Sequence, residues 1–371
     1  MEHVEIAVIG AGASGLGVAA ALQRRGRRPV VLDRDDFVGG TWERRYERLR
    51  LHTARRFSGL PFHPIPRKFG AYVQKDCYAR YLQQYVENMN LDVRLGRSVQ
   101  RIRREDGDWV VTTRQDEWRA RAVVVATGRH NQMRLPDWPG TECFGGQLLH
   151  SADYRSGREF ANLNVLVVGI GNSGAEIAVD LVEQGASHVS IAVRSSPPIS
   201  SREVFGIPVQ VLGILLMPFP TRAVDRAGAA LRRIGNGDLS RFGLGPPAWE
   251  PFSAKRPAVI DVGFVKQLKD GNITVLPGLA RFTPDGVTFI DGRQEKFDVV
   301  VAATGYTSGL SDLLGTLDVL DDRGFPHERS THPPGLFFAG YSETPRGQLF
   351  ESSHASRGLA KAIDRHLKEP S

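Results

Sequence analysis

Two glycine-rich segments of this 371-residue sequence have the spacing of turns that bind dinucleotides. Both follow the pattern G-x-G-x-x-G, as Gly10-Ala11-Gly12-Ala13-Ser14-Gly15 and Gly169-Ile170-Gly171-Asn172-Ser173-Gly174. In such a turn the first glycine permits a tight bend, the second lets the backbone approach a pyrophosphate, and the third lets the next helix pack closely. The first N–H groups of that helix, at its positive dipole end, then face the phosphates.

The residue at the end of the strand that follows each turn differs between the two. Asp33 lies about 20 residues after the first turn, where a carboxylate accepts hydrogen bonds from ribose hydroxyls and repels a 2′-phosphate. Arg194, followed by Ser195 and Ser196, holds the matching position after the second turn, and a cation beside hydroxyls suits the 2′-phosphate of NADP. The alternative for Arg194 is a solvated arginine at a strand end. The pair predicts FAD at the first site and NADPH at the second.

The elements that position these turns are expected to form two βαβ units. In the first unit we predict a strand at Val4–Ile9, a helix to about Arg25 and a returning strand at Pro29–Leu32. In the second we predict a strand at Asn164–Val168, a helix to about Gln184 and a returning strand at His188–Val193. An internal duplication of a nucleotide-binding unit therefore organises the chain.

Further strands are expected outside these units. Ala122–Val125 and Val299–Ala302 run into the similar segments Ala126-Thr127-Gly128 and Ala303-Thr304-Gly305-Tyr306. We also predict a β-meander between Val93 and Arg121, a last parallel strand at Gly335–Ala339 and a helix from about Ser353 to Leu367. Residues 197–258 have weak periodicity and are expected to mix helices and loops over the active site.

The expected fold class is α/β, with two dinucleotide-binding (Rossmann-like) domains. We predict an FAD-binding domain built from both ends of the chain, 1–154 and 301–371. An NADPH-binding domain, 155–300, is inserted into it.

Composition and charge exclude several other classes of protein. The net charge is +7, but the basic residues are scattered, so we expect no nucleic acid as partner. The only two cysteines, Cys77 and Cys143, form neither a disulfide framework nor a dithiol centre, and no metal cluster is evident. The longest apolar run, Val209–Met217, is far below the ~18 residues of a membrane span, so we expect buried core or a substrate tunnel and no stable membrane insertion. With a strand beginning at Val4 there is no room for a signal peptide, and we expect a cytoplasmic protein.

A motif between the two turns points to a family. The segment Phe144-x-Gly146-x-x-x-His150-x-x-x-Tyr154 resembles the identifying motif of the class B flavin-containing monooxygenases, and the chain looks most similar to their YUCCA-type members. The Baeyer–Villiger branch usually ends this motif in tryptophan. Other matching segments are Gly39-Gly40-Thr41-Trp42, Tyr46–His52, Ala303–Tyr306, Val193–Ser196, Val224–Arg226, Phe242–Leu244 and Asp261–Gly263.

The resemblance implies which residues contact the two cofactors. For FAD they are Gly10, Gly12, Ser14, Gly15, Asp33, Gly40, Trp42, Leu49, His52, Thr127 and Gly128, with Gly340 and Gln348 beside the isoalloxazine. For NADPH they are Gly169, Gly171, Asn172, Ser173, Gly174, Arg194 and Ser195, with Thr304 and Gly305 nearby. The Phe144–Tyr154 motif is expected at the hinge between the domains, where His150 and Tyr154 brace a linker rather than react.

The resemblance also implies the reaction. NADPH reduces the flavin, and the flavin reacts with O2 to a C4a-(hydro)peroxyflavin that passes one oxygen atom to a small organic substrate. The acceptor is a nitrogen or sulfur centre, or a 2-oxo acid that undergoes YUCCA-like oxidative decarboxylation. His52 is the candidate catalytic residue, as a neutral imidazole that hydrogen-bonds the flavin or the nicotinamide; a packed histidine is the alternative. The competing functions are a Baeyer–Villiger monooxygenase acting on ketones, and an NADPH oxidase or reductase of the same two-domain fold.

Overall fold

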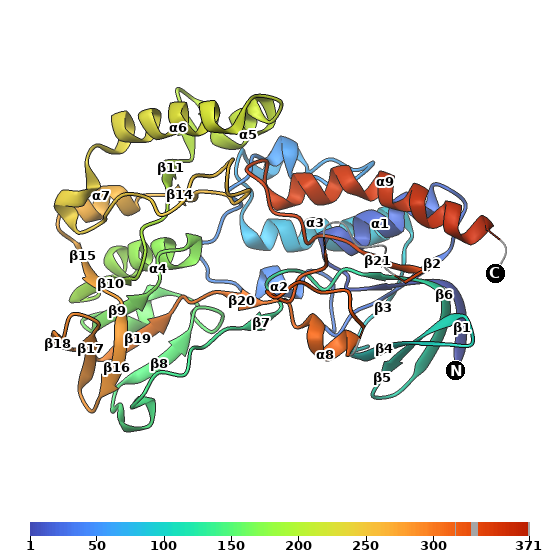
Figure 1. Cartoon of the computed structure of the whole chain (residues 1–371), viewed down its shortest axis with the longest axis horizontal. Helices are drawn as coiled ribbons and strands as arrows, with labels where there is room; N and C mark the ends of the chain where they lie inside the picture. Colours follow the sequence, from blue (N-terminus) through green and yellow to red (C-terminus); the bar gives the residue numbers. More distant parts are fainter. Residues whose placement is uncertain (316, 328–332, 370–371) are drawn as a thin grey trace.

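The computed structural model describes residues 1–315, 317–327 and 333–369. Two large β-sheets dominate these residues, and each is flanked by helices (Figure 1). The mixed α/β class expected from the sequence is confirmed. No helix of the described ranges is long and apolar enough to cross a membrane.

The first sheet combines a parallel part and an antiparallel part. Its strand order is β3 (Asp92–Arg94), β2 (Pro29–Leu32), β1 (Glu2–Ile9), β6 (Glu117–Val125), β5 (Asp108–Thr113) and β4 (Val99–Glu105), with β21 (Leu336–Phe338) also paired to β6. The first half of β6 pairs antiparallel with β5, and its second half pairs parallel with β21. The predicted meander and the predicted last parallel strand are therefore both present.

Three helices cover one face of the first sheet: α1 (Ala13–Gln23), α3 (Lys75–Met89) and α9 (Gln348–Lys368). Helix α1 is apolar all round and buried along most of its length, because it lies against the sheet and is itself covered by α9. Helix α9 begins five residues earlier than the predicted Ser353, at Gln348. On the other face α8 (Leu310–Leu314) packs near β4.

The second sheet is entirely parallel. Its strand order is β15 (Ile273–Pro277), β10 (His188–Val193), β9 (Asn164–Val168), β19 (Val299–Ala302) and β8 (Gln147–His150). Helices α4 (Asn172–Glu183) and α7 (Phe264–Lys269) cover one face. A small antiparallel sheet of β16 (Leu279–Thr283), β17 (Gly286–Phe289) and β18 (Gln294–Lys296) covers the other.

The strand pairing differs from the expected division of the chain at its edges. We assigned 1–154 and 301–371 to one unit, yet β8 at 147–150 and the end of β19 at 301–302 pair within the second sheet. The sequence did not mark β8 because its residues Gln147–His150 carry no glycine turn or long apolar run. The chain therefore enters the second sheet before residue 147 and leaves it after Ala302.

Two extended segments connect the sheets: the first crossing, which contains β7, and the returning crossing, which contains β20. β7 (Gln132–Met133) on the way out pairs antiparallel with β20 (Tyr306–Thr307) on the way back, and Figure 1 shows this pair between the two sheets. The backbone N–H of Arg134 also donates to the carbonyl of Gly305 at 3.1 Å. The two crossings thus support each other as a two-stranded ribbon.

Residues 197–258 contain helices and loops, as expected, and also short strands that the sequence did not predict. They contain β11 (Ile199–Ser201), the hairpin β12 (Glu203–Val204) and β13 (Ile207–Pro208), α5 (Val209–Leu216) and α6 (Thr221–Asn236), and β14 (Val259–Asp261) follows and pairs with β11. The apolar run Val209–Met217, expected as buried core or as a substrate tunnel, forms α5 and the residue after it. Only part of the run is buried, and Leu215 is 62% exposed. The remaining short helices are α2 (Gly40–Glu43), η1 (Arg55–Phe57), η2 (Arg67–Phe69), η3 (Thr141–Cys143), η4 (Gly157–Phe160) and η5 (Leu239–Phe242).

Candidate functional site

One cavity reaches from the first glycine turn to the second. Its volume is about 1430 Å³, more than the roughly 300–1,000 Å³ that an ordinary small-molecule site encloses. Its walls come from both sheets and from the ribbon between them. A cavity of this size has room for more than one ligand of ordinary dimensions.

The three glycines of the first turn have three separate roles. Gly10 has φ +109°, and a β-carbon there would lie 2.6 Å from the carbonyl oxygen of Ala126. A β-carbon on Gly15 would lie 1.9 Å from the carbonyl oxygen of Gly10, so α1 crosses the strand end at backbone distance. Gly12 has no heavy atom within 4 Å of that position and lines the cavity. The turn therefore leaves its middle glycine open to a ligand.

The second turn repeats this geometry. Gly169 has φ +105°, and a β-carbon would lie 2.7 Å from the carbonyl oxygen of Ala303. A β-carbon on Gly174 would lie 1.9 Å from the carbonyl oxygen of Gly169, while Gly171 faces open space. Neither α1 nor α4 has a side-chain cap at its N-terminus, so the first backbone amides of both helices are left for a ligand. Both turns thus fit a pyrophosphate.

The strand-end residues differ in environment as well as in charge. The carboxylate of Asp33 accepts hydrogen bonds from the backbone N–H of Ala11 and, at 2.9 Å, of Asp35. Burial raises the pKa of Asp33, and these backbone hydrogen bonds oppose the rise. Arg194 is exposed, and no carboxylate among the described residues lies within ion-pairing distance of it. Asp33 is held in place, whereas the guanidinium of Arg194 is available to an anion.

Most of the predicted site residues line this one cavity. They are Gly10, Gly12, Ser14, Asp33, Gly40, Trp42, Leu49, His52, Thr127, Gly128, Gly169, Gly171, Asn172, Ser173, Arg194, Ser195, Thr304, Gly305 and Gln348. Gly15, Gly174 and Gly340 are not among its lining residues. The first two serve helix packing, and a β-carbon on Gly340 would lie 2.2 Å from Ser14 Oγ. The carbonyl of Gly340 accepts a hydrogen bond from Gln348 Nε2 at 3.0 Å, so Gly340 supports the wall from behind.

His52 is engaged by a residue that the sequence analysis did not select. Its Nε2 hydrogen-bonds the carboxylate of Glu176, which lies on α4 and is 1% exposed. Tyr46, fully enclosed beside the same carboxylate, has its pKa raised well above the ordinary value, mainly by burial. His52 therefore lines the cavity while one ring nitrogen contacts the opposite sheet's helix. The signal for Glu176 was an acidic residue at a helical position flanked by buried alanine and isoleucine.

Two residues of the Phe144–Tyr154 motif make contacts that hold the chain in place. His150 is 5% exposed; it hydrogen-bonds the carbonyl of Gly305 through Nε2 at 3.0 Å and accepts the N–H of Ala152 at Nδ1. These two contacts require a neutral ring with its proton on Nε2, and burial lowers the pKa of His150. The hydroxyl of Tyr154 donates to Asp180 at 2.7 Å inside the second core. The motif anchors the returning crossing to the second sheet.

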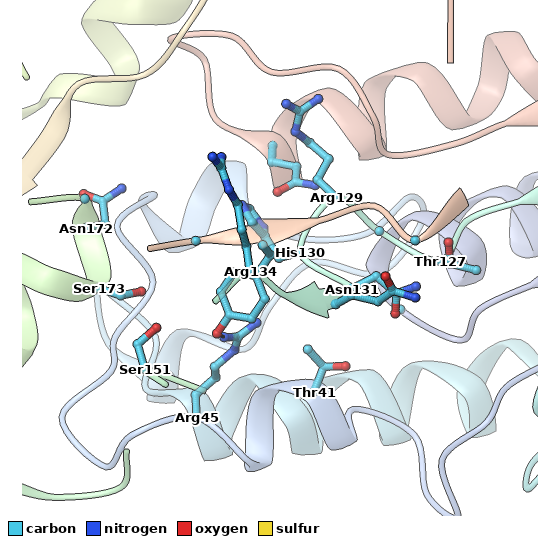
Figure 2. A pocket seen from close by; sticks show the side chains of 18 of the residues that line it. Thr41, Arg45, Thr127, Arg129, His130, Asn131, Arg134, Ser151, Asn172 and Ser173 are labelled. Atoms are coloured by element: carbon cyan, nitrogen blue, oxygen red, sulfur yellow. Dashed lines mark hydrogen bonds between the residues drawn. The ribbon is translucent and has the colours of Figure 1, made fainter. Parts of the chain in front are cut away.

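Polar side chains that the sequence analysis did not select also line the cavity, among them Ser151, His130 and Arg134. Figure 2 shows Ser151, Asn172 and Ser173 on one side of the pocket, with His130 and Arg134 of the first crossing reaching between them and Thr127. Ser151 is 3% exposed, and its hydroxyl has no hydrogen-bond partner among the described residues. A buried, unpartnered hydroxyl beside an open cavity fits a site that is completed by a bound polar ligand.

The comparisons with known proteins agree with this geometry. Residues 7–204 match the model of a pyridine nucleotide-disulphide oxidoreductase family. A flavin-containing monooxygenase from Stenotrophomonas maltophilia superposes with a TM-score of 0.77 at 25% identity, covering 99% of both chains. Cyclohexanone monooxygenase superposes with a TM-score of 0.75 at 20% identity, covering 98% of this chain and 88% of that one, which shows a shared fold alone. The class is therefore that of flavin and pyridine-nucleotide oxidoreductases.

Sequence relatives narrow the class to a family. A probable indole-3-pyruvate monooxygenase of Arabidopsis thaliana, YUCCA3, is 34% identical over 98% of this chain and 87% of its own. The indole-3-pyruvate monooxygenase YUCCA1 of Oryza sativa subsp. japonica is 36% identical over 98% and 92%. The chain belongs to the family of flavin-containing monooxygenases that includes these enzymes. It is an FAD-dependent monooxygenase that uses NADPH, which confirms the family, the activity and the two cofactors predicted from the sequence.

Proposed function

We propose that the first glycine turn binds FAD and the second binds NADPH. The single observation that carries this assignment is the contrast between Asp33 and Arg194 at the ends of equivalent strands. A half-buried carboxylate held at the turn disfavours a 2′-phosphate, and an exposed arginine that pairs with no carboxylate of the described residues favours one. A marked preference for NADPH over NADH follows.

The domain organisation that we propose follows from the same assignment. Two dinucleotide-binding domains share the chain, with the NADPH-binding domain inserted into the FAD-binding domain. We retain the expected division into an FAD-binding domain (1–154 and 301–371) and an NADPH-binding domain (155–300), apart from its edges. The pairing of β8 and β19 supports moving its edges to about 147 and 302.

The residues of the chain bind and orient the reactants. Bound FAD and NADPH supply the redox chemistry itself. The uncapped starts of α1 and α4 would hold the two pyrophosphates, and Asp33 would accept hydrogen bonds from ribose hydroxyls. The cavity wall on the side of the first sheet includes Trp42, Leu49, Thr127, Gly128 and Gln348. There O2 and the substrate would meet the flavin ring away from bulk water.

We propose a 2-oxo acid as the substrate. The relatives named above are indole-3-pyruvate monooxygenases, and they match nearly the whole chain. In the balanced reaction, a 2-oxo acid, O2, NADPH and H⁺ give the carboxylic acid shortened by one carbon, CO2, NADP⁺ and water. Oxygenation of a soft nitrogen or sulfur centre is the second form of the same oxygen transfer.

Product analysis tests this proposal. The purified holoenzyme is incubated with NADPH, O2 and either indole-3-pyruvate, a thioether, an amine or a ketone, and NADPH, product and peroxide are counted. We expect one shortened acid and one CO2 for each NADPH with the 2-oxo acid, and one atom of ¹⁸O2 in the product. NADPH consumption balanced entirely by peroxide with every substrate would reject the proposed function, and an ester from the ketone would favour the Baeyer–Villiger alternative.

We propose that His52 contacts the flavin or the nicotinamide while Glu176 holds its ring. The hydrogen bond between His52 and the buried Glu176 supports this, because it restricts the imidazole to one orientation at the cavity wall. His52→Ala is expected to increase the share of NADPH that ends as peroxide, and to weaken NADP⁺ binding measured by titration. His63→Ala, outside the cavity lining, is the control. Unchanged coupling and unchanged binding in His52→Ala would leave His52 a packed histidine.

We also propose a cytoplasmic location. The two cysteines are free, Cys77 half-buried and Cys143 exposed, and the proposed reductant NADPH is a cofactor of reducing compartments. Fractionation of cells that express the tagged full chain tests this, and recovery with the membrane or secreted fraction would contradict it.

A further inference from the structure

A second arginine lies at the same end of the cavity as Arg194. Arg256 lines the cavity together with Arg194, Ser195 and Trp249. It is exposed, and it makes no ion pair with the acidic residues of the described chain. The two acidic residues nearest to it in the sequence have other partners: Asp261 accepts the backbone N–H groups of Gly263 and Val265, and Glu250 contacts Arg232. This end of the cavity therefore presents two positive charges that no carboxylate in the described part of the chain neutralises by an ion pair.

The backbone brings the segments of the two arginines side by side. The N–H of Ala248 donates to the carbonyl of Ser196 at 2.9 Å, and the N–H of Val259 donates to the carbonyl of Pro198 at 2.9 Å. Beyond these contacts β11 and β14 pair in parallel. Both ends of the segment 248–261 thus contact the stretch from 196 to 201, which follows Arg194, and Trp249 and Arg256 lie between these two contacts.

This stretch is also tied to the second glycine turn. The N–H of Ile260 donates to the side-chain oxygen of Asn172, the first residue of α4, at 2.8 Å. A ligand whose phosphates lie on that helix start therefore has the 256–260 segment beside it. This hydrogen bond places the backbone four residues after Arg256 beside the second glycine turn.

Trp249 holds the guanidinium of Arg256. The Cζ atom of Arg256 lies 4.6 Å from the centroid of the Trp249 ring, within the range of a cation–π contact. The indole ring is half-buried, so it forms a fixed platform for an otherwise flexible side chain. A stacked guanidinium keeps its N–H groups free at the edge, where they can donate to phosphate oxygens.

We propose that Arg256, held on Trp249, is a second specificity residue for the 2′-phosphate of NADPH and acts together with Arg194. The proposal rests on the assignment of NADPH to the second glycine turn. It goes beyond that assignment because the sequence motif around the turn contains neither Trp249 nor Arg256. Two arginines that approach one phosphate from different segments would also explain why neither pairs with a carboxylate of the described residues.

Binding of two adenosine fragments to the FAD-loaded enzyme tests the proposal. Dissociation constants for 2′,5′-ADP, which carries the 2′-phosphate, and 5′-AMP, which lacks it, are measured by calorimetry. The variants are Arg256→Ala, Arg194→Ala, Trp249→Leu and the double variant Trp249→Leu/Arg256→Ala. The control is Arg222→Ala, which removes an exposed arginine outside the cavity lining and changes the net charge equally.

We expect Arg256→Ala to weaken 2′,5′-ADP about tenfold, the usual effect of losing a charge-assisted hydrogen bond, and to leave 5′-AMP within about twofold. Trp249→Leu should weaken 2′,5′-ADP less, and adding it to Arg256→Ala should cause no further selective loss. Wild-type affinity in Arg256→Ala, or equal loss for both fragments, would overturn the proposal even if Arg194→Ala lowers the preference. If the wild-type enzyme does not prefer 2′,5′-ADP to 5′-AMP, the NADPH assignment itself fails.

Discussion

The two glycine turns of this molecule share a backbone and differ in what surrounds it. Their first glycines have φ +109° and +105°, and their helices begin with the same extended cap residue, at φ −80° and ψ near 180°. At the strand end, one turn has a carboxylate bonded to its own backbone and the other has an arginine open to solvent. The shared backbone suits a dinucleotide at both turns, and we infer that the side chains beside each turn select which dinucleotide binds.

The two turns also differ in how the rest of the chain encloses them. The 21-residue helix α9 covers α1, and the hydroxyl of Ser14 donates to Ser352 of that helix at 2.8 Å. Beside the second turn α7 has six residues, and the segment that carries Arg256 is exposed. A more enclosed first site suits a resident cofactor, and a more open second site suits one that must leave after each turnover.

The largest effect is expected from substitution of Gly15 or Gly174, the glycines at which a helix packs against its strand end. Each substitution should disrupt one of the two nucleotide sites. In Gly15→Ala or Gly174→Ala the new methyl group meets a carbonyl oxygen at 1.9 Å, and we expect a loss of about 3 kcal/mol or more in the free energy of unfolding. Gly15→Ala should also lose FAD, while any folded Gly174→Ala should keep FAD and lose NADP⁺ binding. Urea unfolding and flavin content measure both.

Gly358→Ala is the matched control for these variants. It lies on α9 with no heavy atom within 4 Å of the new methyl group, and we expect stability unchanged or raised by up to about 1 kcal/mol. Full flavin content and wild-type stability in Gly15→Ala would refute the close packing of α1 on the first turn.

The next effect concerns the carboxylate of the first site. Asp33→Asn keeps the shape of the side chain but removes its charge, and we expect FAD affinity to fall about tenfold because charge-assisted hydrogen bonds to the ribose are lost. Flavin fluorescence during rebinding to the dialysed apoprotein measures the dissociation constant. Asp322→Asn, on an exposed turn, should bind FAD as the wild type does. Equal affinities for Asp33→Asn and wild type would remove Asp33 from the site.

A smaller loss of stability is expected when the hydrogen bond between Tyr154 and Asp180 is removed. Tyr154→Phe leaves the 5%-exposed Asp180 with one donor fewer, and we expect a loss of about 1–3 kcal/mol in the free energy of unfolding. Activity per folded molecule should stay unchanged. Tyr72→Phe, which removes a hydroxyl bonded to Glu203 at the surface, should cost less. A change in product or in NADPH coupling for Tyr154→Phe would show that the motif does more than brace the crossing.

The smallest effect is a pH dependence of the free energy of unfolding that comes from His150. Burial lowers the pKa of His150, so on acidification the unfolded chain takes up this proton before the folded chain does. The free energy of unfolding should therefore fall as the pH drops below about 6.5, the ordinary pKa of histidine. His150→Gln should lose this part of the pH dependence, and exposed His188→Gln should retain it. Identical pH profiles for wild type and His150→Gln would contradict the assignment.

Local sequence patterns were sufficient for most of the fold. Strands β9, β10 and β19 begin and end where the sequence predicted, because each is an apolar run next to a glycine signal. Strand β8 was missed since Gln147–His150 is short and only partly apolar. Its place in the sheet depends on pairing with Val299–Ala302, a contact between residues far apart in the chain.

The same limit applies to the site. Residues inside the glycine motifs could be predicted because the spacing of the glycines indicates the tight turn and the close helix packing that they permit. The contact of His52 with Glu176 could not, since it joins residues 124 positions apart through the packing of α4 against the first sheet's loops. Trp249 and Arg256 lie in a segment without periodicity, and only its hydrogen bonds to Ser196, Pro198 and Asn172 bring them to the cavity.

The most direct test of the assignment of FAD to the first turn and NADPH to the second is the rate at which each nicotinamide reduces the bound flavin. Anaerobic stopped-flow reduction is followed with NADPH and NADH over a range of concentrations, for the wild type and for Arg194→Ala. We predict that the wild-type enzyme favours NADPH by at least about tenfold in rate per dissociation constant, and that Arg194→Ala loses most of this preference through weaker NADPH binding. Comparable efficiency with NADH in the wild-type enzyme would contradict the account.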